Sequence, residues 1–116
     1  MASRILLAPK RGALYDKQVR IIARRTLREF WAAGHADAKK PLRAWHARAR
    51  QAKWKSMADI KRDDASASAV NADYVVFNIG GNKYRLVASP WFAGQTLYIK
   101  FIGTHRAYDK INVTER

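Results

Sequence analysis

The hydrophobic pattern of this chain changes its period near Tyr74, and that change restricts the possible folds more than any other feature. Before Tyr74, apolar residues recur every three or four positions, which is typical of amphipathic helices. After it, β-branched and aromatic residues gather in short runs bounded by Gly and Pro, which is typical of strands. Because helices come first and strands follow, the 116 residues predict one α+β domain rather than an alternating α/β fold.

The first helix is predicted over residues 26–33, after a short strand-like run at 19–22. Thr26 stands three residues before Glu29, the spacing of a capping box, and Gly34 supplies a position suited to ending a helix. One face of this helix is apolar and consists of Leu27, Phe30 and Trp31.

A second helix is predicted over 38–52 and a third over 57–62. Asp37 is expected to cap the second helix, with Pro41 in its first turn, and Ser56 with Asp59 repeats the capping pattern for the third. In the second helix, Trp45 lies on the apolar face, and core packing is the expected role of Trp31 and Trp45. The small residues at 65–69 predict a connector or a weak strand.

Three strands are predicted over 74–79, 84–87 and 97–102, the first two joined by a hairpin at Gly80-Gly81-Asn82. In the last strand the side chains alternate, so one face is expected to pack on the helices and the other to stay polar and available. The inner set is Leu97, Ile99 and Phe101, and the outer set is Tyr98 and Lys100. The architecture expected is an antiparallel meander with one covered face.

The chain is strongly basic, with 23 Lys and Arg against 9 Asp and Glu and a net charge of +14. Such a surplus attracts polyanions, so nucleic acid is the first partner to consider, although an acidic protein or a membrane surface would satisfy the same charge. The absence of Cys excludes disulfides, thiolate zinc sites and Cys nucleophiles. Three scattered His predict no metal site, no cofactor is implied, and the lack of a spanning apolar segment predicts no membrane partner and a cytoplasmic location.

Polar side chains on the open sheet face are the candidate functional groups. Asn78, Arg85 and Lys100 are expected to project from that face, and His105 follows the last strand, three residues before Tyr108. Arg and Lys could hold a phosphate, while imidazole and phenol could transfer protons. Each group also has a structural explanation: a solvated Arg, an exposed His, a packed Tyr ring, or an Asn that satisfies a turn.

Cations on the second and third helices form a second candidate set. Asp37 is the only acidic residue between positions 30 and 58, and no acid follows four residues after the Arg and Lys residues of the second helix, which suggests an external anion, although a solvated helix face is the simpler interpretation. Trp91 and Phe92, expected in a loop, could stack on nucleobases. The cations are Arg43, Arg48, Arg50, Lys53, Lys55 and Lys61.

Several segments together resemble the HigB toxins of bacterial type II toxin-antitoxin systems, within the RelE-like superfamily, and the resemblance extends from about residue 19 to 112. The segments are Arg24-Arg25-Thr26-Leu27-Arg28-Glu29-Phe30-Trp31, Pro41-Leu42-Arg43-Ala44-Trp45, Trp54-Lys55-Ser56-Met57-Ala58-Asp59-Ile60-Lys61, Val76-Phe77-Asn78-Ile79-Gly80-Gly81-Asn82-Lys83-Tyr84-Arg85-Leu86-Val87 and Tyr98-Ile99-Lys100-Phe101-Ile102-Gly103-Thr104-His105-Arg106-Ala107-Tyr108-Asp109-Lys110.

The resemblance implies two or three helices against one face of a small antiparallel sheet, with a short C-terminal helix. It also implies a metal-independent endoribonuclease that cuts mRNA in the ribosomal A site and is neutralised by a HigA-like helix-turn-helix antitoxin. Arg85 would bind the phosphate and stabilise the transition state, and His105 and Tyr108 would transfer protons or stack on a base. Lys83 and Lys100 would assist, and the identity of the general base is left open.

Residues 1–18 fall outside the resemblance and are expected to be a basic N-terminal extension to a toxin domain at 19–116. Two other functions remain open from the sequence. The chain could be a non-catalytic basic module that binds RNA or DNA, or a degenerate toxin that acts only together with its antitoxin.

Overall fold

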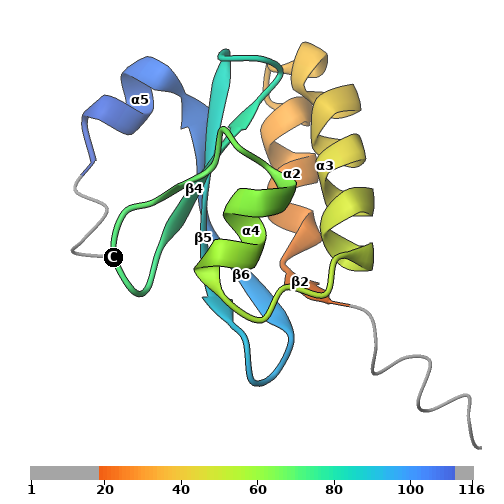
Figure 1. Cartoon of the computed structure of the whole chain (residues 1–116). Helices are drawn as coiled ribbons and strands as arrows, with labels where there is room; N and C mark the ends of the chain where they lie inside the picture. The colour runs from red at the N-terminus through yellow and green to blue at the C-terminus, as the bar shows by residue number, and fades with distance from the viewer. Residues whose placement is uncertain (1–18, 112–116) are drawn as a thin grey trace, which may run out of the picture.

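A computed structural model describes residues 19–111, and the predicted extension at 1–18 lies outside the described residues. The described chain is α+β, as predicted (Figure 1). Within it, no helix has the length and apolar character needed to cross a membrane. In chain order the elements are β2 (Arg20–Ile22), α2 (Arg24–Ala32), the 3₁₀ helix η1 (Ala36–Ala38), α3 (Lys39–Gln51), α4 (Met57–Asp63), β3 (Ser68–Ala69), β4 (Val75–Ile79), β5 (Tyr84–Trp91), β6 (Thr96–Thr104) and α5 (His105–Asp109).

The five strands form one sheet in the order β2-β6-β5-β4-β3. The meander from β3 to β6 is antiparallel, as predicted, but β2 pairs with β6 in parallel, with Ile21 opposite Leu97. The expectation of a purely antiparallel sheet is therefore wrong. Three α-helices and the 3₁₀ helix η1 separate β2 from the meander, so the chain has the long crossover that a parallel neighbour requires.

A register shift in the β5–β6 pair decides which side chains share a face. Val87 pairs with Phe101 whereas Ala88 pairs with Ile99, so Lys100 is the extra residue of a β-bulge. One extra residue reverses the faces of the side chains that follow it. Leu97 therefore belongs to the helix-side core while Phe101 packs on the opposite side, and the predicted shared face of Leu97, Ile99 and Phe101 is wrong for Phe101.

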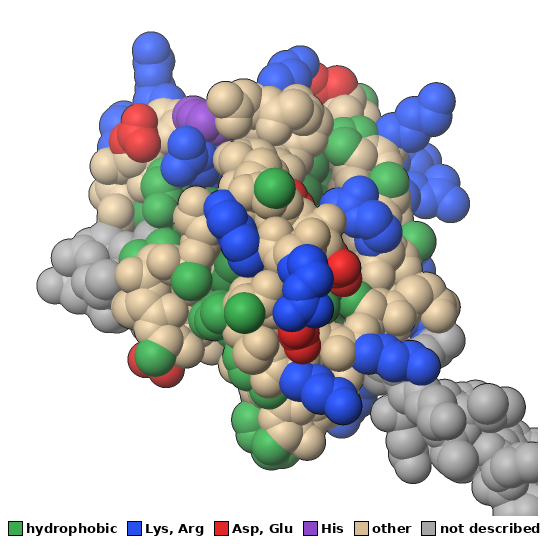
Figure 2. Space-filling view, in the orientation of Figure 1, with side chains coloured by type: hydrophobic (Ala, Val, Ile, Leu, Met, Phe, Trp, Pro, Cys, Tyr) green, Lys and Arg blue, Asp and Glu red, His purple; other side chains and the backbone are tan. Residues whose placement is uncertain are grey.

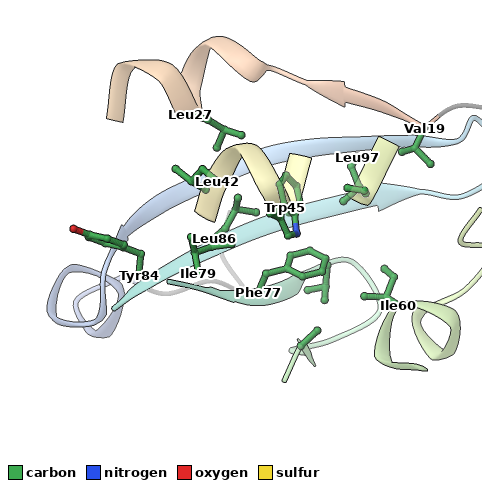
Figure 3. Close-up of a cluster of buried hydrophobic side chains, with 14 of the residues drawn as sticks. Val19, Leu27, Leu42, Trp45, Ile60, Phe77, Ile79, Tyr84, Leu86 and Leu97 are labelled. Atoms are coloured by element: carbon green, nitrogen blue, oxygen red, sulfur yellow. The ribbon is translucent and has the colours of Figure 1, made fainter. Parts of the chain in front are cut away.

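The main core lies between the sheet and helices α2 and α3 (Figure 3). Trp45 is 2% exposed and its ring centroid lies 5.2 Å from that of Phe77, which confirms its predicted core role. Trp54 stacks on Phe77 from α4's side of the core, with centroids 5.9 Å apart. Trp31 is partly buried and packs against this cluster.

The opposite face of the sheet carries a second, smaller cluster. Tyr74, Val76 and Val87 are buried there, and Phe101 and Tyr108 pack against them. Figure 1 shows α5 on the other side of the sheet from α2 and α3. The prediction of one covered and one open face therefore needs correction, because α5 covers one end of the second face.

Helix α2 begins two residues before the predicted cap. Its N-cap is Ala23, which makes no side-chain hydrogen bond, and Thr26 lies inside the helix. Glu29 accepts a hydrogen bond from Arg25 Nε at 2.8 Å rather than completing a capping box. The capping-box prediction is therefore wrong, because β2 runs directly into the helix. The predicted end at Gly34 is confirmed by its φ of 104°.

Asp37 does not cap α3, contrary to expectation. It lies in η1, the N-cap is Ala38, and the Asp37 carboxylate accepts hydrogen bonds from Lys83 and from the Tyr84 hydroxyl. A tertiary partner thus replaces the local one. By contrast, Ser56 does cap α4, since its Oγ accepts from Asp59 N at 3.2 Å.

The predicted hairpin between β4 and β5 is present. Gly80 and Gly81 have φ values of 65° and 71°, which glycine adopts without a steric penalty. The next hairpin differs from the prediction, because β5 continues through Pro90 to Trp91, where a loop was expected. Phe92 lies in the following turn and packs partly against the main core.

Candidate active site

Arg85, His105 and Tyr108 meet on the α5 side of the sheet. The Arg85 Nε donates a hydrogen bond to His105 Nε2 at 3.2 Å. The guanidinium carbon of Arg85 lies 4.9 Å from the centre of the Tyr108 ring, within the range of a cation–π contact. Three residues separated by up to 23 positions in the chain therefore form one cluster, which we call the Arg85 cluster.

The strand alternation of β5 aims Arg85 at this face. Its neighbours Tyr84 and Leu86 are buried in the helix-side core, so the side chain between them points the other way. Across the sheet, Arg85 stands opposite Asn78 of β4 and Gly103 of β6. Within residues 19–111, no carboxylate pairs with this guanidinium.

Helix α5 positions the other two groups. The Thr104 Oγ1 caps it by accepting from Ala107 N at 3.1 Å, so His105 is its first residue. Tyr108 follows three positions later, and residues at this spacing share a helix face. Gly103 permits the close approach of α5, because a Cβ at this position would lie only 2.6 Å from Phe101 Cζ and 3.4 Å from Ala107 Cβ.

The Arg85 cluster has the chemical groups that handling a phosphate requires. Apart from Nε, the guanidinium retains its two terminal nitrogens, which can donate to paired anionic oxygens. A hydrogen bond accepted at His105 Nε2 requires that nitrogen to be unprotonated, with the ring proton on Nδ1. When an anion attracts the guanidinium, this imidazole nitrogen becomes available to accept a proton.

Asn78 lies beside the Arg85 cluster and helps to build its floor. Its side-chain nitrogen donates to Ser66 O at 3.2 Å, which ties β4 to the preceding loop. Its Oδ1 is buried and has no hydrogen-bond partner among the described residues. The structure therefore brings Asn78 next to Arg85, as the strand alternation predicted.

Lys83 does not join the Arg85 cluster. Its ammonium pairs with Asp37, which also accepts from Tyr84 Oη at 2.5 Å. The hydrogen bond from Lys83, followed by the one from Tyr84, lowers the pKa of Asp37 below its ordinary value. The same contact raises the pKa of Lys83, and the hydrogen bond to Asp37 raises the pKa of Tyr84. These groups hold the β4–β5 hairpin to η1.

Lys100 is separated from Arg85 along the sheet. It precedes Gly103, the cross-strand neighbour of Arg85, by three residues, and its ammonium lies 5.9 Å from the centre of the Tyr98 ring. The side chain is exposed. Lys100 is thus placed to contact a ligand that extends along the sheet rather than the group held by Arg85.

Arg43 and Arg50, predicted to bind RNA, lie on α3 on the helix side of the sheet. Together with Arg24 and His46 they line a depression of about 300 Å³. Burial, and then the charges of Arg24 and Arg50, lower the pKa of His46. The depression belongs to the side of the sheet opposite the Arg85 cluster.

The other predicted RNA-binding cations differ in their surroundings. The Arg48 guanidinium lies 4.0 Å from the Asp64 carboxylate. This partner is 16 residues away, so the spacing of charges on one helix does not predict it. The Lys61 ammonium donates to Ala65 O at 2.6 Å and to Ala67 O at 2.9 Å, which gives it a structural role. Lys53 and Lys55 are exposed. Figure 2 shows that Lys and Arg side chains outnumber Asp and Glu on the visible face.

Phe101 and Gly103 are contributors to the site that sequence reasoning missed. Gly103 could have drawn attention as a lone glycine at the end of a strand, since such a residue often marks a close approach. Nothing in the sequence marks the β-bulge that turns Phe101 toward Tyr108, with ring centroids 6.4 Å apart. Within residues 19–111, no group of three His, Asp or Glu side chains comes together as a metal site would require.

The fold and the Arg85 cluster define the class of protein. It is a small basic α+β protein in which a guanidinium, an imidazole and a phenol meet on one face of the sheet. These groups suit a ligand that contains a phosphate. Comparison with known families gives the particular one. The family described as HigB_toxin, RelE-like toxic component of a toxin-antitoxin system, matches residues 38–111, more than half of the chain. The chain belongs to this family.

Curated relatives agree with the assignment. The chain is 42% identical over 43 residues to the mRNA interferase toxin HigB of Escherichia coli strain K12, a match that covers 37% of this chain and 41% of that protein. The same values hold for the mRNA interferase HigB of Escherichia coli O157:H7 and of Shigella flexneri. The chain therefore matches about two fifths of the length of these curated relatives.

Proposed function

We propose that this protein is the toxin of a toxin-antitoxin system and acts as an endoribonuclease on mRNA, with a RelE-like fold. The observation that carries the proposal is the Arg85 cluster, in which a guanidinium contacts both an imidazole and a phenol ring. Membership of the HigB toxin family supports the toxin role, and the names of the curated relatives support mRNA as the substrate.

The reaction consists of attack by a ribose 2′-OH on the adjacent phosphorus. The 2′-oxygen loses its proton and forms a bond to phosphorus, and the bond from phosphorus to the 5′-oxygen breaks. The departing 5′-oxygen takes up a proton, so the products are a 2′,3′-cyclic phosphate and a 5′-hydroxyl. This route balances without a metal or an external oxidant.

Arg85 serves as the phosphate-binding and transition-state-stabilising residue in this proposal. Negative charge builds on the phosphate oxygens in the transition state, and fixed donors aimed at that charge commonly contribute a factor of about 10²–10³ to the rate. His105 Nε2 is the first candidate for the proton acceptor, since its lone pair is already directed at the guanidinium. Tyr108 either donates the proton to the leaving oxygen or stacks on a base.

The helix-side cations suit a second RNA contact. The depression lined by Arg24, Arg43, His46 and Arg50 lies across the sheet from the Arg85 cluster, so a folded RNA could bind there while a single strand occupies the site. We assign this role to ribosomal RNA near the A site. A HigA-like helix-turn-helix protein is the proposed antitoxin.

Expression of the Arg85→Ala variant tests the proposal. We expect growth arrest to be lost while the circular dichroism spectrum and capture by the antitoxin are retained. Arg25→Ala is the matched control, because Arg25 is exposed and its ion pair within residues 19–111 is with Glu29, one turn away on α2, so its growth arrest should match that of the wild type. Unchanged growth arrest with Arg85→Ala would contradict the proposal.

Primer extension on a reporter transcript separates the remaining functions. Cuts confined to translated frames would support ribosome-dependent cleavage, whereas cuts in untranslated regions as well would show that the ribosome is not needed. Tight, salt-dependent RNA binding without strand scission would instead identify a non-catalytic module or a degenerate toxin.

A further inference from the structure

Helix α5 covers only one end of its side of the sheet, and no other helix of residues 19–111 lies over the rest of that face (Figure 1). Strand alternation and the pairing register show which side chains of β2, β5 and β6 lie on this face. Leu97 faces the main core, so Thr96 and Tyr98 face the α5 side, and their partners on β5 are Trp91 and Ser89. On β2, Arg20 pairs with Thr96 and Ile22 pairs with Tyr98.

This face exposes large hydrophobic side chains. The large hydrophobic residues exposed within 19–111 are Ile22, Val70 and Trp91, and two of these three lie on this face. Trp91 is 54% exposed. Its ring packs against Gly94, because a Cβ added at Gly94 would come within 2.4 Å of two ring carbons. Trp91 is therefore an aromatic side chain that contacts Gly94 and still leaves about half of its surface accessible.

The charge of the same face is positive. The five strands contain no Asp or Glu, while Arg20, Arg85 and Lys100 stand on this side. The Lys100 ammonium lies beside the Tyr98 ring, 5.9 Å from its centre. Cations and aromatic rings thus share this face, the combination that binds single-stranded nucleic acid through its phosphates and its bases.

The uncovered face is continuous with the Arg85 cluster. Trp91 and Arg85 lie on the same strand six residues apart, and at about 3.3 Å per residue this corresponds to about 20 Å. Tyr98 and Lys100 lie between them on β6. A strand of several nucleotides could therefore extend from the Arg85 cluster to Trp91 along one surface.

From these observations we infer that Arg20, Trp91, Tyr98 and Lys100 form a binding track for single-stranded RNA on one side of the scissile linkage. Bases stack on Trp91 and Tyr98, and Lys100 and Arg20 hold the backbone. The inference rests on the proposed nuclease function, because it takes the Arg85 cluster as the point of cleavage. An acidic protein segment is the alternative occupant, but it would use the cations and leave the exposed aromatic rings of the same face unexplained.

Binding of a labelled, single-stranded 2′-O-methyl RNA of twelve nucleotides tests the track without cleavage. We expect Trp91→Ala to weaken the dissociation constant about tenfold, since stacking of one base contributes a loss of roughly this size. Trp91→Phe should recover most of the affinity because it restores a ring. Val70→Ala is the matched control, since Val70 is exposed but does not lie on the track, and it should bind as the wild type does.

Lys100→Ala provides a second test that does not depend on an aromatic side chain. We expect the slope of log affinity against log salt to fall by about one, as the loss of one phosphate contact predicts. Wild-type affinity with Trp91→Ala, or an unchanged salt slope with Lys100→Ala, would overturn the inference. Tighter binding of a labelled hexaglutamate peptide than of the RNA, with the peptide alone sensitive to Trp91→Ala, would also overturn it.

Cleavage of unmodified RNA by the wild type, measured in parallel, separates the two proposals. Cleavage that is intact in the wild type, combined with RNA binding insensitive to Trp91, would refute the track alone. RNA binding that depends on Trp91, without any cleavage by the wild type, would refute the nuclease function and leave a single-strand binding face.

Discussion

The substitution Gly103→Ala should damage both the stability of the protein and the Arg85 cluster. An added Cβ would lie 2.6 Å from Phe101 Cζ, 3.1 Å from Phe101 Cε2 and 3.4 Å from Ala107 Cβ. The first distance is far below van der Waals contact, and the partly buried ring already packs against the second cluster and lies beside Tyr108 of α5. Either the Phe101 ring or helix α5 must therefore move.

Overpacking of this kind commonly costs about 1–3 kcal/mol. For a domain of this size, each kcal/mol lowers the melting temperature by about 4–8 °C, so we expect a fall of at least about 4 °C in a thermal melt followed by circular dichroism. Because α5 carries His105 and Tyr108, its displacement should also separate them from Arg85 and reduce RNA cleavage.

Gly81→Ala is the matched control for this prediction. Gly81 has a φ of 71° and nothing within 4 Å of an added Cβ, so the substitution strains the backbone by about 1–2 kcal/mol without touching the cluster. Cleavage by this variant at a temperature where it is folded should equal that of the wild type.

A double mutant gives the sharpest check. Phe101→Leu removes the ring atoms that an added Cβ would meet, so the pair Gly103→Ala and Phe101→Leu should lose less stability than the sum of the single changes. Additive losses, or a Gly103→Ala variant that melts with the wild type and cleaves normally, would refute the packing argument.

Three further changes test other contacts. Asp37→Asn should lower the melting temperature at neutral pH. Because the hydrogen bond from Lys83 holds the pKa of Asp37 below its ordinary value, the ionised carboxylate stabilises the fold at pH values above the ordinary pKa, and this stabilisation is lost as the pH falls through the lowered pKa. The melting temperatures of variant and wild type should therefore converge at acid pH. Lys61→Met should cost about 1.5 kcal/mol in urea unfolding, since its ammonium donates to two loop carbonyls, and an unchanged midpoint would argue that these contacts do not persist in solution. Phe77→Ala should cost about 3–5 kcal/mol because the ring is fully buried between two Trp side chains, and a loss below 1 kcal/mol would contradict that packing.

Local patterns in the sequence determined the element types and much of the core. The helical spacing around Trp45, the Ser56 cap and the glycine hairpin each express short-range geometry, and each is found in the structure. Arg85 also follows from local pattern, because the buried residues on either side of it fix the direction of its side chain. Its meeting with His105 and Tyr108 agrees with what the family resemblance implied.

Only the tertiary structure decided the contacts between distant segments. Asp37 does not cap a helix, because its carboxylate accepts hydrogen bonds from Lys83 and Tyr84, which lie 46 and 47 residues away in the chain. The β-bulge at Lys100 turns Phe101 to the other face, a change that alternation of residue types cannot reveal. The parallel pairing of β2 sets Arg20 and Ile22 beside β6, and the three residues of the strand could not reveal it, because strand partnership depends on how the whole chain closes around its core.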